Sequence, residues 1–409
     1  MRRIKAFFAA IIALSFVSCA NDIETEETET ETTAEVSSEH QNKVMKDDWR
    51  NITPSGEHDV SVLFVNVGKA DSIIVDIDGS YYMIDTGTSE SVPYTFAALE
   101  ALGVDKLSGV FITHPDRDHV GGYSYIRDKY EVECVYSSSI CGDMYVIEGA
   151  AVKDTLVKLD PGEVVSAGDG VYFEVLGPIK YNADDDNNNS LVLRLRVNGV
   201  TVLFAGDMKK EEEKSLLNAG IDFKCDVLKV GHHGRKDATS EKFIESAQPE
   251  YAVISTSTEE EERSANENVI EALEKNNCEV YNTEDYDLGI MMKIEEDGRI
   301  IFDNFETSAS AEKIKIDSVS KSTQTLMLKN KAGYDVDLSG WYVTSSRGGE
   351  VFCFPKGTVI KAGETLTLAC KGSDGDIIWN ETNVWHDSKD DTASLIDNYG
   401  NLVDTKESK

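Results

Sequence analysis

The residues best suited to chemistry lie in one short segment, Thr113-His114-Pro115-Asp116-Arg117-Asp118-His119-Val120-Gly121-Gly122. It places two imidazoles and two carboxylates within six residues, directly after the apolar run Leu107–Ile112. Such a run is typical of a buried strand, so the segment would bring metal-binding side chains to one edge of a sheet. Imidazole and carboxylate at this density suit two divalent cations better than one structural ion. The segment therefore predicts metal-assisted hydrolysis.

Polar side chains also follow four other predicted strands. They are Asp85, the turn Asn187–Ser190, Asp207, and the pair His232 and His233. The helical patterns between the strands are Pro93–Leu102, Val120–Lys129, Glu211–Asn218 and Ala265–Asn276, the last with a capping box of Ser264 and Glu267. Two strand-rich halves flanked by helices predict an α/β (α+β) fold, an αββα sandwich whose loops at one sheet edge carry the site.

With these motifs in order, residues 58–300 resemble the metallo-β-lactamase superfamily, and within it the hydrolase domain of the ComEC-type competence proteins. The resemblance rests on five segments: Asn66-Val67-Gly68-Lys69-Ala70-Asp71-Ser72, Ile84-Asp85-Thr86-Gly87, His114–Gly122, Ala205-Gly206-Asp207 and Lys229-Val230-Gly231-His232-His233-Gly234. It implies two divalent cations, zinc or manganese, that bridge a hydroxide for attack on a phosphodiester. The metal ligands that it implies are His114, Asp116, Asp118, His119, Asp207 and His233.

Roles within this set follow from the same resemblance. The first ion would lie on His114 and Asp116, and Asp207 would bridge to the second ion. Asp118 and His119 would hold that second ion with one of the two later histidines.

The residues expected to act in catalysis are Asp118, His232 and Asp85. His233 is favoured as the metal ligand, so that His232 would orient it or face the substrate, where it could protonate the leaving oxygen. Asp85 would fix a histidine by a hydrogen bond.

The segment also departs from the superfamily pattern. Asp116 stands where histidine is usual, and no histidine occurs near Asn187–Ser190. Oxygen ligands at the first site favour manganese or a mixed pair over zinc alone. Arg235 replaces the serine that usually follows the His-His-Gly element, and Ser264-Ala265-Asn266 stands where Gly-His-Pro is common.

The N-terminus predicts export. Residues 1–19 combine a basic start, the apolar run Ala6–Val17 and a cysteine after small residues. This pattern resembles a bacterial lipobox, which would make Cys19 a lipidated membrane anchor; an ordinary cleaved signal is the alternative. Residues 20–57 are rich in glutamate and threonine and predict a disordered tether. The expected location is the extracellular face of the bacterial membrane, with secretion as the alternative.

Charge and cysteine content narrow the function. The net charge of −35 argues against a broad nucleic-acid-binding surface, although bound metal can supply local positive charge. Six cysteines besides Cys19 permit the disulfides Cys134–Cys141 and Cys353–Cys370, and free thiols are equally open. The sequence has no Cys-x-x-Cys pattern, so cysteine-bound zinc is not expected.

The C-terminal part, residues 312–409, resembles a lamin-tail domain, an immunoglobulin-like all-β sandwich. The resemblance rests on Val336-Asp337-Leu338-Ser339-Gly340-Trp341, Phe354-Pro355-Lys356-Gly357-Thr358, Lys361-Ala362-Gly363-Glu364, Trp379 and Asn398-Tyr399-Gly400-Asn401-Leu402-Val403-Asp404. Trp341 and Trp379 are expected in its core. The domain suggests adhesion or targeting, and its ligand is unknown. The predicted hydrolase domain precedes it and comprises residues 58–305.

Three functions are consistent with the sequence. The first is a surface-anchored, metal-dependent phosphodiesterase or nuclease acting on DNA or an envelope polymer. The second is an envelope-directed hydrolase that cleaves phosphodiesters such as teichoic-acid substituents, or an ester or lactone. The third is a surface binding protein whose hydrolase fold has lost activity.

Overall fold

The computed structural model describes residues 44–45, 57–151, 154–308, 313–386 and 388–409. The predicted signal segment, with Cys19, and most of the predicted tether lie outside these described residues. Within the described part, none of the helices has the length and apolar character needed to span a bilayer.

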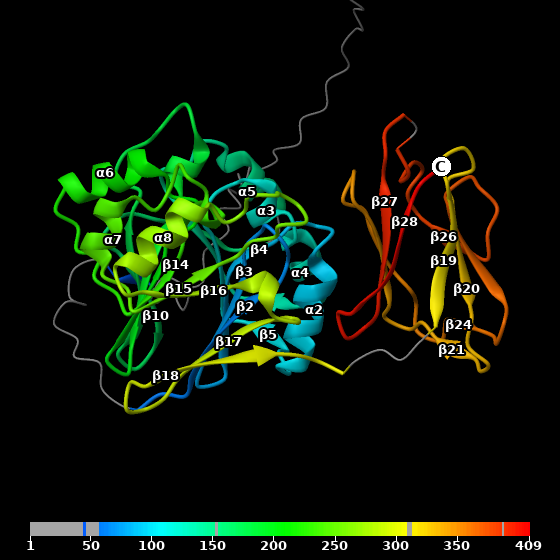
Figure 1. The fold of residues 1–409 in the computed structure, drawn as a ribbon, viewed down its shortest axis with the longest axis horizontal. Helices are drawn as coiled ribbons and strands as arrows, with labels where there is room; N and C mark the ends of the chain where they lie inside the picture. The colour runs from blue at the N-terminus through cyan, green and yellow to red at the C-terminus, as the bar shows by residue number, and fades with distance from the viewer. Residues whose placement is uncertain (1–43, 46–56, 152–153, 309–312, 387) are drawn as a thin grey trace, which may run out of the picture. The chain divides into compact units, whose positions relative to one another are not determined.

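Two mixed sheets form the larger part of the described chain (Figure 1). The first has the strand order β18 (Ile300–Phe305), β17 (Gly289–Ile294), β2 (Val60–Val65), β3 (Ser72–Ile77), β4 (Ser80–Thr86), β6 (Gly109–Ile112), β8 (Val135–Ser138) and β9 (Leu156–Leu159). The second has the order β1 (Val44–Met45), β10 (Val164–Gly168), β11 (Val171–Gly177), β12 (Val192–Val197), β13 (Val200–Phe204), β14 (Val227–Lys229), β15 (Tyr251–Ile254) and β16 (Glu279–Asn282). The short strands β5 (Lys106–Leu107) and β7 (Glu131–Val132) pair with each other.

Helices cover the outer face of each sheet (Figure 1). Those on the first sheet are α2 (Val92–Ala101), α3 (Arg117–Val120), α4 (Tyr123–Lys129) and α5 (Met144–Ala150). Those on the second are α6 (Lys210–Asn218), α7 (Glu241–Ala247) and α8 (Glu267–Lys275). The layers run helix, sheet, sheet, helix, which confirms the predicted αββα sandwich.

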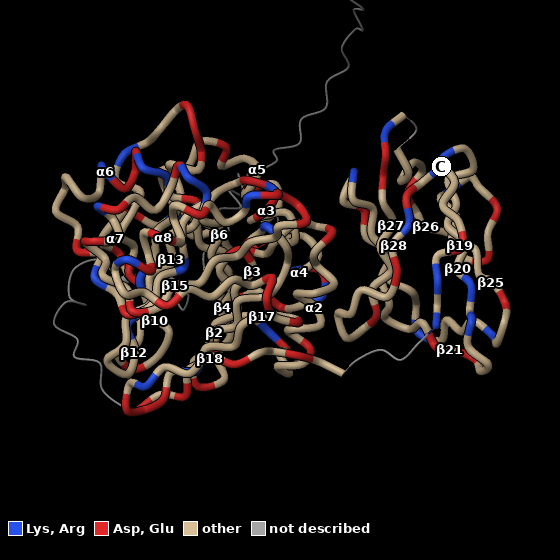
Figure 2. The backbone as a smooth tube through the Cα atoms, viewed as in Figure 1, with Lys and Arg blue, Asp and Glu red and all other residues tan. Residues whose placement is uncertain are grey.

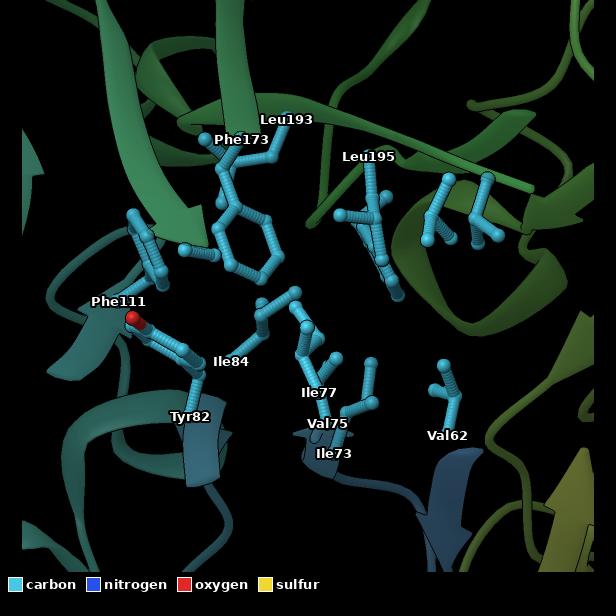
Figure 3. Packing of buried hydrophobic residues seen from close by; sticks show 14 of the residues in the cluster. Val62, Ile73, Val75, Ile77, Tyr82, Ile84, Phe111, Phe173, Leu193 and Leu195 are labelled. Carbon is cyan, nitrogen blue, oxygen red and sulfur yellow. The ribbon is translucent and has the colours of Figure 1, made fainter. Parts of the chain in front are cut away.

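The alternation of side chains along the strands explains these layers. In β3, Ile73, Val75 and Ile77 point into the core between the sheets, whereas Ile74 packs against the helices. Figure 3 shows these three facing Phe173 and the leucines of β12 across that core. Burial of both strand faces fixes the register, because a one-residue shift would exchange the two sets.

The parallel strands place the polar loops at one edge. β4, β6, β8 and β9 are parallel neighbours in the first sheet, as are β13 to β16 in the second. Their carboxyl ends therefore lie on the same side of each sheet. The loops after β4, β6, β13 and β14 carry the polar motifs found in the sequence.

The predicted helix 120–129 is wrong in its continuity. The structure has α3 and α4 with Gly121 and Gly122 between them. A Cβ atom on Gly122 would lie 2.2 Å from the carbonyl oxygen of Thr86, so the two glycines allow this segment to pack directly on the end of β4. The helical periodicity could not reveal this tertiary contact.

The predicted capping box of the last helix is also wrong. Asn266 caps α8 and accepts a hydrogen bond from the Asn268 amide. Ser264 instead forms a hydroxyl–hydroxyl hydrogen bond with Thr256.

The C-terminal part is all-β, as predicted. Its strands are β19 (Ile314–Ser320), β20 (Thr325–Asn330), β21 (Val336–Asp337), β22 (Tyr342–Ser345), β23 (Val351–Cys353), β24 (Val359–Ile360), β25 (Thr365–Cys370), β26 (Ile377–Trp379), β27 (Thr392–Ile396) and β28 (Leu402–Glu407). Trp341, Trp379 and Trp385 are buried in a hydrophobic core of their own. Of the two alternatives that the sequence left open for the cysteines, the structure has free thiols at all six cysteines of the described part.

Acidic side chains dominate the charge of the chain, and Figure 2 shows Asp and Glu along many of its loops. One acid, Glu212 in α6, is buried, and neither of its carboxylate oxygens has a hydrogen-bond partner among the described residues. Burial, helped by the charge of Glu213, raises the pKa of Glu212 well above its usual value.

We expect Glu212→Gln to stabilise the protein at pH 8 by about 1–3 kcal/mol, because the amide is uncharged, whereas the buried carboxyl must either carry a charge or retain a proton at that pH. A carboxyl whose pKa is raised by folding contributes stability below its unfolded pKa, near 4.5, and this stability is lost as pH rises through the folded pKa. Denaturant unfolding followed by circular dichroism at pH 5 and pH 8 tests the prediction. The exposed Glu245→Gln is the control, and equal midpoints for Glu212→Gln and wild type at pH 8 would contradict it.

Candidate metal centre

Asp85 orients one of the predicted metal-binding histidines, His119, by a hydrogen bond. It is the penultimate residue of β4 and has a positive φ of 57°, a conformation that aspartate adopts more readily than most residues. Its carboxylate accepts hydrogen bonds from the amide and hydroxyl of Thr113, each at 2.8 Å, and lies 2.8 Å from Nδ1 of His119. Nδ1 of His119 therefore carries the proton, and its Nε2 presents a lone pair to the opposite side.

Four side chains converge on that Nε2 side: Asp118, His119, Asp207 and His233. One ligand atom from each lies within 4.8 Å of all the others. Oδ1 of Asp207 is 3.3 Å from Nε2 of His119 and 3.4 Å from Nε2 of His233, and Oδ2 of Asp118 is 3.5 Å from Nε2 of His233. Two imidazoles and two carboxylates around one point are a donor set for a divalent cation.

The second oxygen of Asp207 faces a different group. Oδ2 lies 4.0 Å from Nε2 of His114 and 3.8 Å from Nε2 of His232. Oδ2 of Asp116 is 3.6 Å from the same nitrogen of His114, although the Asp116 side chain is 48 % exposed. Asp207 therefore stands between two groups of nitrogen and oxygen donors.

The two adjacent histidines point to different partners because of the backbone. His232 and His233 have positive φ values of 48° and 53°, between Gly231 and Gly234. Nδ1 of His233 lies 3.0 Å from the carbonyl oxygen of Ser255. Non-glycine residues in this region carry backbone strain, and such strain is concentrated at functional sites.

His232 has polar partners on both ring nitrogens. Nδ1 lies 2.9 Å from Oδ1 of Asp237, and Nε2 lies 3.3 Å from Nδ2 of Asn187. The carboxylate holds the proton on Nδ1, so Nε2 is the acceptor. Burial lowers the pKa of His232, which keeps this imidazole neutral at pH 7.

The donor atoms of the cluster lack hydrogen-bond partners among the described residues. This holds for Nε2 of His114, His119 and His233 and for Oδ1 of Asp207, all of them buried. Native proteins rarely leave buried polar atoms unpaired, so these atoms fit a bound cation.

The pKa values of the cluster point the same way. Burial alone would lower the pKa of His233, but the carboxylates of Asp207, Asp118 and Asp71 together raise it to about 9. The neighbouring imidazoles outweigh burial at Asp207 and hold its pKa well below the usual range. The carboxylates thus create a strongly negative site that attracts positive charge.

The structure brings the sequence-predicted residues together and adds others to which the sequence assigned no role. Asp71 and Lys229 form a buried ion pair with 2.7 Å between Oδ2 and Nζ. Asp237 is a further addition, and it contacts His232 together with Asn187 of the predicted polar turn. The signal for Asp71 and Lys229 was present, since each belongs to a motif segment, but pairing between residues so far apart is not visible in a sequence.

Comparison with known proteins agrees with this geometry. Residues 65–258 match the model of the Metallo-beta-lactamase superfamily, and residues 307–408 match that of the Lamin Tail Domain. ComE operon protein 3 of Bacillus subtilis (strain 168) is 28 % identical over 256 residues, which cover 57 % of this chain and 32 % of that protein. Competence protein ComA of Neisseria gonorrhoeae is 31 % identical over 202 residues, covering 49 % and 27 %. The chain thus spans about a third or less of the length of these relatives.

Solved structures give weaker likenesses. The metallo-beta-lactamase fold protein YhfI from Bacillus subtilis has a TM-score of 0.40 at 12 % identity, covering 57 % of this chain and 99 % of that one. A diphosphatase from the PhnP family has a TM-score of 0.36 at 13 % identity, covering 57 % and 98 %.

Proposed function

The chain carries a metallo-β-lactamase superfamily domain followed by a lamin tail domain, and on that premise we propose that it is a metal-dependent phosphodiesterase. The observation that carries the proposal is Asp207, whose two carboxylate oxygens face two separate groups of donors. A carboxylate in this position suits a pair of ions, and paired ions suit displacement at phosphorus.

We assign one ion to Asp118, His119 and His233 and the other to His114 and Asp116, with Asp207 shared. His232 would be a further nitrogen donor on the second side, because Nε2 of its neutral ring lies toward Oδ2 of Asp207, and an ion there would replace the hydrogen bond from Asn187. This assignment replaces the proton-donor role suggested by the sequence. It also compensates for the histidine that is missing near residues 187–190. Manganese, zinc or a mixed pair suits this combination of oxygen and nitrogen donors.

Divalent ions bound here would activate water and neutralise the charge that develops on the phosphoryl oxygens. The residues of the chain orient the ligands. Asp85 holds the Nδ1 proton of His119, and the carbonyl of Ser255 does the same for His233. Asp237 fixes His232 in turn. These contacts set the ring orientations before a substrate arrives.

We further propose a location and a substrate class. The predicted lipid on Cys19 would hold the enzyme at the extracellular face of the membrane, where DNA and phosphate-containing envelope polymers are available. The net charge of −35 favours short or envelope-bound diesters over long DNA, which a broad basic surface would bind. The lamin tail domain would then contribute targeting through a ligand that is unknown.

The test is a substrate panel with purified full chain. We expect hydrolysis of bis(p-nitrophenyl) phosphate with manganese or zinc, loss of activity with chelator, and recovery when metal is restored. Plasmid and oligonucleotide substrates separate a nuclease from an enzyme specific for other diesters. A chain that binds no metal and cleaves none of these substrates would be a binding protein, and the proposal would be wrong.

A further inference from the structure

Two cations meet one carboxylate beside the metal centre. Lys69 lies in the β2–β3 loop, Arg235 follows the Gly231–Gly234 turn, and Glu261 belongs to the loop between β15 and α8. Nζ of Lys69 is 3.8 Å from Oε2 of Glu261, and the guanidinium of Arg235 donates to the same oxygen through Nε and Nη2. A single carboxylate oxygen therefore contacts two cations and can balance the charge of only one of them.

This group is directly connected to the metal centre. Nζ of Lys69 lies 3.9 Å from Oδ2 of Asp118. The amide of Arg235 donates to the carbonyl oxygen of His232 at 2.9 Å. The Lys69 side chain is 14 % exposed, whereas those of Glu261 and Arg235 are 37 % and 39 % exposed. The group thus forms part of the rim of the centre, with an enclosed side at Lys69 and an open side at Arg235.

Residues other than Glu261 also hold this loop in position. Glu260 accepts a hydrogen bond from the Lys69 amide at 3.3 Å. Thr258 donates its amide and hydroxyl to Glu284 at 2.7 and 2.9 Å. A partly exposed ion pair adds little to stability. The contacts of Glu261 with Lys69 and Arg235 are therefore not explained by the stability of the loop.

Guanidinium and ammonium groups that converge on one oxygen also suit a phosphate. Their position is unusual in a chain with a net charge of −35. We propose that Lys69 and Arg235 form a second anion-binding site for a phosphate next to the scissile phosphodiester, and that Glu261 occupies this site until the substrate displaces it. The proposal rests on the phosphodiesterase function and narrows its substrates to diesters with a neighbouring anionic group.

A matched pair of substrates isolates this contact. Thymidine 5′-(p-nitrophenyl phosphate) and its 3′-phosphorylated analogue release the same chromophore, p-nitrophenol, and differ by one phosphate. With the manganese-loaded full chain, we expect the ratio of kcat/KM values to favour the analogue about tenfold, the worth of one charged hydrogen bond. Arg235→Gln should remove most of that preference, and Arg235→Lys should retain part of it.

Glu261→Gln should change the preference for the phosphorylated analogue in the opposite direction to Arg235→Gln. Removing the competing carboxylate should raise the preference for the phosphorylated analogue severalfold, whereas loss of a purely structural ion pair would shift both variants in the same direction. Arg299→Gln is the matched control, since this exposed arginine pairs with Asp297 in the β17–β18 turn and should keep the wild-type ratio.

Calorimetric binding of thymidine 3′,5′-bisphosphate to the manganese-loaded chain separates the two possible failures. Tighter binding to Glu261→Gln and weaker binding to Arg235→Gln support the anion site even if neither ester is hydrolysed, in which case only the phosphodiesterase function fails. Hydrolysis of both esters with equal ratios and equal bisphosphate affinities in all variants would overturn the anion site alone.

Discussion

Replacing Asp207 with asparagine is expected to lower hydrolysis by the metal-loaded protein about a thousandfold or more, because the residue is proposed to hold both ions. Each carboxylate oxygen faces a different donor group, so the substitution weakens both positions at once. The amide is nearly isosteric and uncharged, which keeps the packing while removing the shared negative charge. We expect metal content, measured after dialysis, to fall along with activity.

Two neighbouring substitutions serve as comparisons for Asp207→Asn. His233→Gln removes a donor only on the Oδ1 side of Asp207, and His232→Gln removes one only on the Oδ2 side. Each should therefore weaken one ion more than the other, giving a metal content between those of wild type and Asp207→Asn. The shared-ligand role fails if Asp207→Asn retains the wild-type metal content, or if His232→Gln and His233→Gln lose both ions together.

The sequence revealed those parts of the site that depend on local order. His114 and His119 lie in one short segment after β6, and the change from buried strand residues to a polar cluster marks a strand end. The family resemblance implied that Asp85 fixes a histidine, and in the structure its carboxylate lies 2.8 Å from Nδ1 of His119. The sandwich could also be predicted, because apolar alternation identifies strands that are buried on one or both faces.

What could not be predicted depends on contacts between distant segments. The proton on Nδ1 of His232 follows from Asp237, and the direction of each histidine follows from two consecutive positive φ values. Neither has a signature in residue type. The β17–β18 hairpin was also missed, since its outer strand is only partly buried and carries Asp303 and Asn304 among its apolar residues.

The second large effect is expected for Lys229→Met, which should destabilise the larger domain by about 3–5 kcal/mol. This is the usual cost of removing one partner of a buried ion pair, because the other charge is left without a partner. The Lys229 side chain is 1 % exposed and that of Asp71 is 2 % exposed, with 2.7 Å between Nζ and Oδ2. Nζ also donates to the carbonyl of Val230 at 3.1 Å. Because Lys229 ends β14 and Asp71 precedes β3, the pair connects the two sheets.

Loss of this ion pair should also weaken metal binding at the centre. Asp71 lies 3.7 Å from Nδ1 of His233 and 4.0 Å from Nδ1 of His119, and its amide donates to the carbonyl of Asp118 at 3.1 Å. Groups that support metal ligands in this way typically contribute about 10–100-fold to metal affinity. We therefore expect Lys229→Met to bind manganese more weakly than wild type at temperatures where it is still folded.

A double-substitution cycle separates the ion pair from general packing. Lys229→Met combined with Asp71→Asn removes both charges, so it should recover much of the stability that the single lysine variant loses. Hydrogen exchange of peptides from β3 and β14 measures this directly, with the exposed Lys214→Met as control. Three of the four tryptophans belong to the core of the C-terminal sandwich. The unfolding transition followed by tryptophan fluorescence should therefore have the wild-type midpoint in every variant. If peptides from β14 are as protected from hydrogen exchange in Lys229→Met as in wild type, the ion pair does not join the sheets. The orientation of His233 must then depend on Ser255 instead.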